Sequence, residues 1–461
     1  MSHILRRWPI VLVVTAVVWL IVVQLLEMMT VDTYLNREKN TTMKEMLHPP
    51  TLNEPIMANT KPFNPLPLLD SAVPTFSIVK DQIQSTRQEH PSSSRTTGSS
   101  SSNLCLSVEC IHTVARDLAR AFPDRHDHEW ICHEPSPAPH NYTREGILLV
   151  KTFKAASSTV AGVVLGIARN HATKNGSWAW VKWHHTPGME YKNRNPRRSF
   201  LLTSLRDPAA RAISRYFYTA VSWQGIRPTE TSMIEWLKDN HPQYGSVAEQ
   251  GGFQFRFGSL RPLPIVWDKR NKTHVSDPLG VQGNVRQILF DYDFILIAER
   301  LDESLVALSM VMGLEVDEVV VMDAKVAGGS TYLFEKSPGK PAMCWKLVRS
   351  FRPKRVNDYI KSAEWRAINY GDYLLHAAAS YSLDSTIDRL GRQNFDRRLL
   401  EYRRLKHIVE FQCANATFLP CSVIGKPQRA KSKRNCLGDD SGCGYKCIEA
   451  VLSKDRASRE G

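Results

Sequence analysis

The chain has no collagen-like glycine repeat, a deficit of acidic residues and only one apolar run long enough to cross a bilayer. Glycine accounts for 24 of 461 residues, and 42% of the residues are apolar against 23% charged. These values exclude a collagen, a wholly disordered chain and a protein with several membrane spans. The 60 Lys and Arg residues outnumber the 46 Asp and Glu residues, giving a net charge of +14. Such a chain suits an anionic partner: nucleic acid, a membrane surface, or a small phosphorylated or sulfated ligand.

The one long apolar run covers residues 10–26. With the two residues before it, the run reaches about 19 residues, close to what a transmembrane helix needs. Arg6 and Arg7 precede the run and acidic residues follow it, so the positive-inside rule predicts residues 1–9 in the cytosol and the remainder in the lumen. The alternative is a cleaved signal peptide, but no small-x-small cleavage site follows the run. We therefore expect a signal anchor and a single-pass type II membrane protein.

Cysteines and glycosylation sequons agree with a lumenal chain. All nine cysteines follow the apolar run, so disulfides are permitted. The C-terminal cysteines lack the C-x2-C spacing typical of zinc sites, which favours disulfides there. Near the start of the ordered region, Cys105 and Cys110 could pair with each other or with Cys132. The five N-x-Ser/Thr sequons are at Asn40, Asn141, Asn175, Asn271 and Asn415.

Composition divides the lumenal part into three segments. Residues 27–103 show little periodicity, are rich in proline and end in a Ser-rich tract, so we expect a disordered stem. Ordered patterning begins near residue 104, and we expect a catalytic domain over residues 104–425. Residues 426–461 form a basic tail that contains cysteines.

The expected domain alternates strands with helices. Short buried strands are predicted at residues 146–150, 199–205 and 294–298, and helices at 157–168, 208–218 and 303–312. This alternation predicts an α/β fold with a central, mainly parallel sheet flanked by helices. Ligands in such folds gather at the carboxyl ends of strands, so the loops that leave Val150, Leu205 and Ala298 are the informative ones.

The loop after the first strand is suited to an anion. It contains Lys154 followed by Ser157, Ser158 and Thr159 at the start of a helix, where hydroxyl groups and backbone N–H groups can surround a phosphate. The Walker pattern G-x-x-x-x-G-K-[ST] is absent. The order of residues is instead typical of the phosphosulfate loop of sulfotransferases. The plain alternative is a serine-capped helix beside a solvated lysine.

The loop after the second strand adds an independent motif. Arg206 ends the strand, Asp207 and Pro208 suit a helix cap and first turn, and Ser214 follows about two turns later. An arginine fork and a hydroxyl from two elements can clamp one phosphate. R-D-P-x-x-R-x-x-S-x-Y resembles the site that holds a 3′-phosphate in sulfotransferases.

Together these motifs resemble the Golgi galactose 3-O-sulfotransferase family. K-T-F-K-A-A-S-S-T-V is similar to the family's K-T-H-K-x-x-S-S-T-V, a Trp-His-His triplet precedes the second strand, and E-R-L-D-E-S-L follows the third. The similarity covers roughly residues 146–322. Phe153 stands where the family has a histidine, and the family's L-N-A-R stretch is not evident at residues 323–326. Both departures concern the acceptor more than the donor.

The resemblance implies a P-loop-like sulfotransferase fold, a Golgi membrane location and 3′-phosphoadenosine 5′-phosphosulfate (PAPS) as donor, without a metal. It implies that the donor is held by Lys151, Thr152, Lys154, Ser157, Ser158, Thr159, Arg206 and Ser214. Sulfuryl transfer needs charge stabilisation, which Lys154 would supply, and a base for the acceptor hydroxyl. His184 and His185 are the candidate bases, with His185 favoured by the family pattern. Glu299 and residues 254–258 are candidates for acceptor contact.

The function expected from the sequence is transfer of sulfate to a glycan, with the galactose 3-hydroxyl of a glycolipid or glycoprotein as first choice. The alternatives are a sulfotransferase of another glycan, with uronic acid or N-acetylgalactosamine as acceptor, and a non-catalytic lumenal glycan-binding protein. A lumenal kinase needs a Walker-B-like acidic pair, which is not evident. A lumenal location argues against nucleic acid as partner. The sequence does not indicate an oligomeric state.

Overall fold

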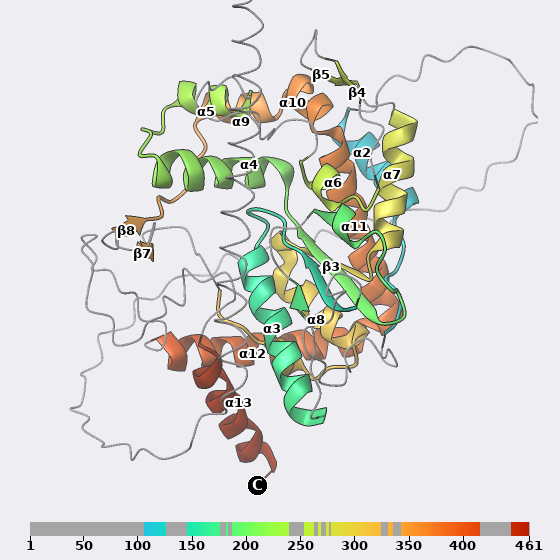
Figure 1. Cartoon of the computed structure of the whole chain (residues 1–461), viewed down its shortest axis with the longest axis vertical. Helices are drawn as coiled ribbons and strands as arrows, with labels where there is room; N and C mark the ends of the chain where they lie inside the picture. The colour runs from blue at the N-terminus through green and yellow to red at the C-terminus, as the bar shows by residue number, and fades with distance from the viewer. Residues whose placement is uncertain are drawn as a thin grey trace, which may run out of the picture. The chain divides into compact units, whose positions relative to one another are not determined.

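The computed structural model describes residues 106–125, 145–175, 181–182, 187–238, 253–261, 266–268, 273–275, 278–323, 331–334, 343–414 and 444–460. All of them belong to one unit, Thr96–Gly461 (Figure 1). The predicted anchor, the predicted stem, His184 and His185 lie outside the described residues. Within the described part, no helix has the length and apolar character that a membrane span requires.

A parallel sheet forms the centre of this unit. Its strands follow the order β2-β1-β3-β6, and each strand is parallel to its neighbours. The strands are β1 (Gly146–Val150), β2 (Val181–Lys182), β3 (Ser199–Leu205) and β6 (Phe294–Ile297). Every residue of β1, β3 and β6 is buried, as expected for strands covered on both faces. The predicted α/β class with a parallel sheet is therefore confirmed.

Helices flank this sheet. Figure 1 shows α3 (Ser157–Asn175) on one side of β3, with α7 (Pro278–Asp291) and α11 (Tyr370–Leu390) on the other. The predicted helix after β1 begins at the expected residue and runs seven residues further than predicted, to Asn175 rather than Ala168. Its polar C-terminal half weakens the apolar signal in the sequence, which explains the short prediction.

Further helices complete the unit. They are α2 (Val108–Leu118), α4 (Pro208–Tyr216), α5 (Glu230–Leu237), α6 (Phe253–Gly258), α8 (Leu301–Val311), α9 (Lys354–Ile360), α10 (Ala363–Ile368), α12 (Arg392–Cys413) and α13 (Tyr445–Glu460). Short helical segments are η2 (Gly188–Tyr191), η4 (Ala298–Arg300), η5 (Val316–Val319) and the π-helical η3 (Phe217–Trp223), which continues α4. Two antiparallel pairs join β4 (Val266–Asp268) to β5 (Thr273–Val275) and β7 (Thr331–Phe334) to β8 (Met343–Lys346).

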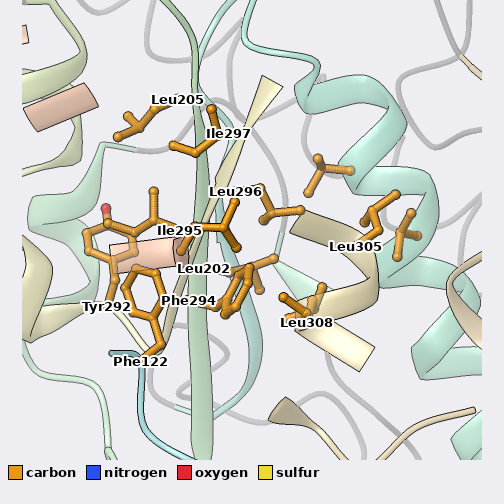
Figure 2. Packing of buried hydrophobic residues seen from close by; sticks show 14 of the residues in the cluster. Phe122, Leu202, Leu205, Tyr292, Phe294, Ile295, Leu296, Ile297, Leu305 and Leu308 are labelled. Atoms are coloured by element: carbon orange, nitrogen blue, oxygen red, sulfur yellow. The ribbon is translucent and has the colours of Figure 1, made fainter. Parts of the chain in front are cut away.

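The main core packs around β6. Figure 2 shows the side chains of Phe294 and Leu296 among Phe122, Leu202 and Leu308. Phe122 and Phe294 have ring centroids 5.0 Å apart, and each is fully buried. Burying a side chain of this size contributes about 1.5–3 kcal/mol. Packing in this core fixes the position of β6 in the sheet. It therefore also fixes where the loop after β6 begins.

A second apolar cluster lies beside the first and holds α4. It joins α4, η3, α5, α9 and α10, each of which contributes one of the buried residues Ile213, Phe217, Trp236, Val356 and Trp365. The indole Nε1 of Trp365 donates to the hydroxyl of Tyr373 at 3.0 Å, which ties this cluster to α11. Helix α4, which follows β3, is therefore held in place by packing in the second cluster.

The C-terminal helices are joined covalently. A disulfide links Cys413, at the end of α12, to Cys447 in α13. Cys110 in α2 is also disulfide-bonded. Both cysteines of this pair come from the C-terminal group for which the sequence favours disulfides.

Candidate functional site

The loop between β1 and α3 has an unusual backbone. Lys151 and Thr152 are buried, and the Thr152 hydroxyl lies 3.2 Å from that of Thr203 on β3. Lys154 and Ala156 then adopt φ angles of +61° and +58°. Non-glycine residues rarely occupy this left-handed region, and such residues cluster at ligand-binding sites.

The first turn of α3 follows directly after this loop. Ser157 and Thr159 are buried, Ser158 is half-buried, and the turn contains no acidic residue. The Val160 amide donates to Ala156 O at 3.1 Å and so closes the turn. The N-terminal end of a 19-residue helix carries a partial positive charge and backbone N–H groups directed outward. This arrangement can receive an anion.

The turn between β3 and α4 is built as its sequence predicts. The Asp207 carboxylate accepts from the Ala210 amide at 2.7 Å, so Asp207 is the N-cap, and Pro208 follows at the first helical position. Arg206 therefore lies one residue beyond the end of β3 and directly before the cap. Ser214, half-buried, lies six residues into α4 after Pro208.

The two predicted motifs meet at this edge of the sheet. The Arg206 guanidinium Nη1 donates to the main-chain oxygen of Lys154 at 3.2 Å. This contact joins the loop after β1 to the turn after β3, 52 residues apart. Burial lowers the pKa of Arg206, although the Glu299 carboxylate acts in the opposite direction. The Arg206 side chain is 34% exposed, so its guanidinium is accessible to an anionic ligand.

Aromatic side chains lie against the loop between β1 and α3. The Lys154 ammonium lies 4.0 Å from the centre of the Tyr218 ring, on η3. The Arg215 guanidinium lies 5.3 Å from the ring centre of Phe153, which in turn meets Phe257 edge-on at 6.4 Å. Both cations thus make cation–π contacts. Tyr218 was not predicted as a site residue, since nothing in its spacing distinguishes it from a core aromatic.

Glu299 follows β6 and faces the same turn. Its Oε1 accepts from the Asp207 amide at 3.0 Å and lies 3.8 Å from Arg206 Nε. Its Oε2 lies 3.2 Å from His376 Nε2, on α11. Partial burial raises the pKa of Glu299, but the contacts with His376 and the Asp207 amide outweigh burial and lower it overall. The contact of Glu299 is therefore with the turn between β3 and α4.

Gln254, which the sequence offers as a candidate for acceptor contact, is another partner of this turn. Its side-chain amide is buried and bonds to the backbone of Arg206. Gln254 and His376 lie 48 and 170 residues from Arg206 in sequence, so no local motif could have joined them. Of the predicted site residues, those from Lys151 to Thr159 and Arg206 lie at this one edge. Ser214 lies further along α4, next to Arg215, whose guanidinium contacts Phe153.

The predicted bases, His184 and His185, lie outside the described residues. They follow β2, which ends at Lys182 beside β1. In the described part of the chain, no group of three His, Cys, Asp or Glu side chains is arranged to hold a metal ion. No protein-family model, curated protein or solved structure matches the chain.

Proposed function

We propose that this chain is a PAPS-dependent carbohydrate sulfotransferase with a P-loop-like sulfotransferase fold. The observation that carries the proposal is the contact between Arg206 Nη1 and Lys154 O at 3.2 Å. It puts the residues expected to bind the 3′-phosphate beside the residues expected to bind the 5′-phosphosulfate. A nucleotide with phosphates at both positions is the ligand that suits two adjacent anion sites.

Each part of the donor has a proposed partner. The hydroxyls of Ser157, Ser158 and Thr159 and the N–H groups of the first turn of α3 would hold the 5′-phosphate. Arg206 and Ser214 would hold the 3′-phosphate, for which the planar guanidinium is well suited. Lys151 and Thr152 are buried beneath the loop and would support it from within.

The proposed reaction is a single in-line displacement. The acceptor hydroxyl oxygen forms a bond to sulfur while the bond from sulfur to the 5′-phosphate oxygen breaks. The leaving oxygen takes the electron pair, giving adenosine 3′,5′-bisphosphate, and Lys154 stabilises the charge that develops there. The hydroxyl proton passes to His185 or His184, since an imidazole is a suitable base near neutral pH. The reaction needs no metal in this scheme.

We propose a glycan as acceptor and the galactose 3-hydroxyl of a glycolipid or glycoprotein as first choice. A uronic acid or N-acetylgalactosamine acceptor is the alternative, because Phe153 departs from the family histidine. The proposed location is the Golgi membrane, with residues 10–26 as a type II anchor and residues 27–103 as a stem. A chain that binds glycans without catalysis is the second alternative.

The test is transfer of labelled sulfate from PAPS by the full-length protein to a panel of glycans. The panel contains galactose-terminated, uronic acid and N-acetylgalactosamine acceptors. Lys154→Ala and His185→Ala are measured beside the parent, with Lys361→Ala as a matched control because Lys361 is exposed on another helix end. We expect label on galactose, loss with both site variants and parent activity in the control.

Label on another sugar would keep the donor chemistry and replace the acceptor. An absence of label on every acceptor, together with no stabilisation by adenosine 3′,5′-bisphosphate, would contradict the proposed function. Stabilisation by a glycan without transfer would favour the binding-protein alternative.

A further inference from the structure

Helix α11 reaches the Arg206 turn through α6. Asp372, in the first turn of α11, is fully buried and accepts from the backbone amides of Gln254 at 3.2 Å and Phe255 at 2.7 Å. These are amides at the start of α6, whose first turn needs acceptors. Packing between the two helices is tight, since a Cβ added at Gly371 would lie 2.9 Å from Phe255 Cδ1. Helix α6 is therefore fixed on α11.

The side chain of Gln254 connects α6 to the backbone of Arg206. Its Nε2 donates to the main-chain oxygen of Arg206 at 2.7 Å, and its Oε1 accepts from the Arg206 amide at 2.8 Å. The side chain is 1% exposed. The Gln254 amide thus pairs with Arg206 as a neighbouring strand would, one residue beyond the end of β3.

Only glutamine satisfies both bonds from this distance. Glutamate has no donor for the Arg206 carbonyl, asparagine is one methylene shorter, and methionine has similar size but neither polar group. Because Arg206 is the first residue after β3, its backbone direction decides where its guanidinium points. The Arg206 guanidinium lies against Lys154 O, so an error in that direction would separate the two anion sites.

We propose that Gln254 is a positioning residue: held by Asp372, it aligns Arg206 so that the guanidinium meets the 3′-phosphate of the donor. This inference rests on the proposed function, because it takes the Arg206 site to be the 3′-phosphate site. It assigns Gln254 to the donor, whereas the sequence suggested that residues 254–258 reach the acceptor. The alternative is that the Gln254 side-chain amide only stabilises the turn and does not affect ligand binding.

The experiment separates alignment from stability by comparing two ligands. Adenosine 3′,5′-bisphosphate and adenosine 5′-monophosphate differ only in the 3′-phosphate, so the ratio of their dissociation constants reports on the Arg206 site. Both constants are measured by calorimetry for the full-length protein and for Arg206→Ala, Gln254→Met and the matched control Gln287→Met. Gln287 bonds to Asp291 on α7, away from the turn.

We expect Gln254→Met to reduce the preference for the bisphosphate by about tenfold or more, because small misplacements of a binding group are costly. Affinity for the monophosphate should stay at the parent value. In the Arg206→Ala background the same substitution should have no further effect on the ratio, since the group that it aligns is gone. Gln287→Met should leave the ratio unchanged.

The outcomes separate the two proposals. If the parent shows no preference for the bisphosphate, the donor site fails and the inference with it. If the parent shows the preference and Gln254→Met retains it, or loses affinity for both ligands equally, the inference alone is wrong. If Gln254→Met does not fold, the same ratio of dissociation constants is measured for Gln254→Asn. Asparagine keeps a buried amide, but its side chain is one methylene shorter.

Discussion

The ammonium group of Lys154 lies 4.0 Å from the centre of the Tyr218 ring, so the cation of the loop between β1 and α3 packs against the π-helical segment that continues α4. The ring restricts the flexible side chain of the lysine that we propose as a ligand of the donor. We predict that Tyr218→Leu lowers the rate of sulfate transfer about two- to fivefold, matching a cation–π contact of about 0.5–1 kcal/mol. Tyr218→Phe keeps the ring and should transfer at nearly the parent rate. Equal losses in the two variants would assign the effect to the hydroxyl.

Ala156 is predicted to gain stability from replacement by glycine. Its φ of +58° costs an alanine about 1–2 kcal/mol, whereas glycine adopts it freely. The greater entropy of glycine in the unfolded chain offsets part of this gain, so we expect Ala156→Gly to stabilise the protein by roughly 0.5 kcal/mol. Urea unfolding measures the change.

The neighbouring residue supplies the control for that substitution. Ala155 is fully buried and is not among the residues with positive φ, so Ala155→Gly should destabilise the protein. A loss of stability in both variants would show that the loop is not strained at Ala156.

Stability should depend on pH through Glu299. Contacts with His376 and the Asp207 amide lower its pKa below the ordinary value of 4.5, so its contribution is present above that pH and is lost as the pH falls through the lowered pKa. Glu299→Gln should therefore be less stable than the parent near pH 7, and the gap should close as the pH falls below about 4.5. Urea midpoints measured across this range test the prediction.

The control for Glu299 is Glu235→Gln, which removes one carboxylate from an exposed position on α5. A gap between parent and Glu299→Gln that stays constant down to low pH would contradict the assigned direction of the pKa shift.

Loss of the disulfide should destabilise the C-terminal helices. The Cys413–Cys447 bond closes a loop with a sequence separation of 34 residues. We expect Cys413→Ala to lower the free energy of unfolding by about 2–4 kcal/mol. The measurement is urea unfolding of the variant against the parent. The control is Ser458→Ala, an exposed position on the same helix α13 that leaves the disulfide intact, and it should unfold at nearly the parent midpoint.

Much of this fold could be read from local patterns. The strands at 146–150 and 199–205 appear at the predicted residues because fully buried parallel strands are continuous apolar runs. The cap at Asp207 was predictable for a similar reason, since capping depends on adjacent residues. Lys154 and Arg206 were predicted to serve one ligand, and their loops lie in contact.

The rest of the site depends on tertiary packing. Gln254 and Glu299 contact the Arg206 turn, and His376 contacts Glu299, from three elements that are far apart in sequence. A single sequence contains no signal for such pairings, because glutamine, glutamate and histidine occur on most surfaces. The left-handed φ of Lys154 is equally hidden, since no glycine marks it.

The covalent link between α12 and α13 also determines what proteolysis can release. The peptide segment from residue 414 to residue 446 and the Cys413–Cys447 bond together form a closed ring. A single cut within that segment opens the ring without dividing the molecule. The nicked protein would therefore migrate as one piece under oxidising conditions and as two after reduction, with α13 retained on α12 until the thiols are restored.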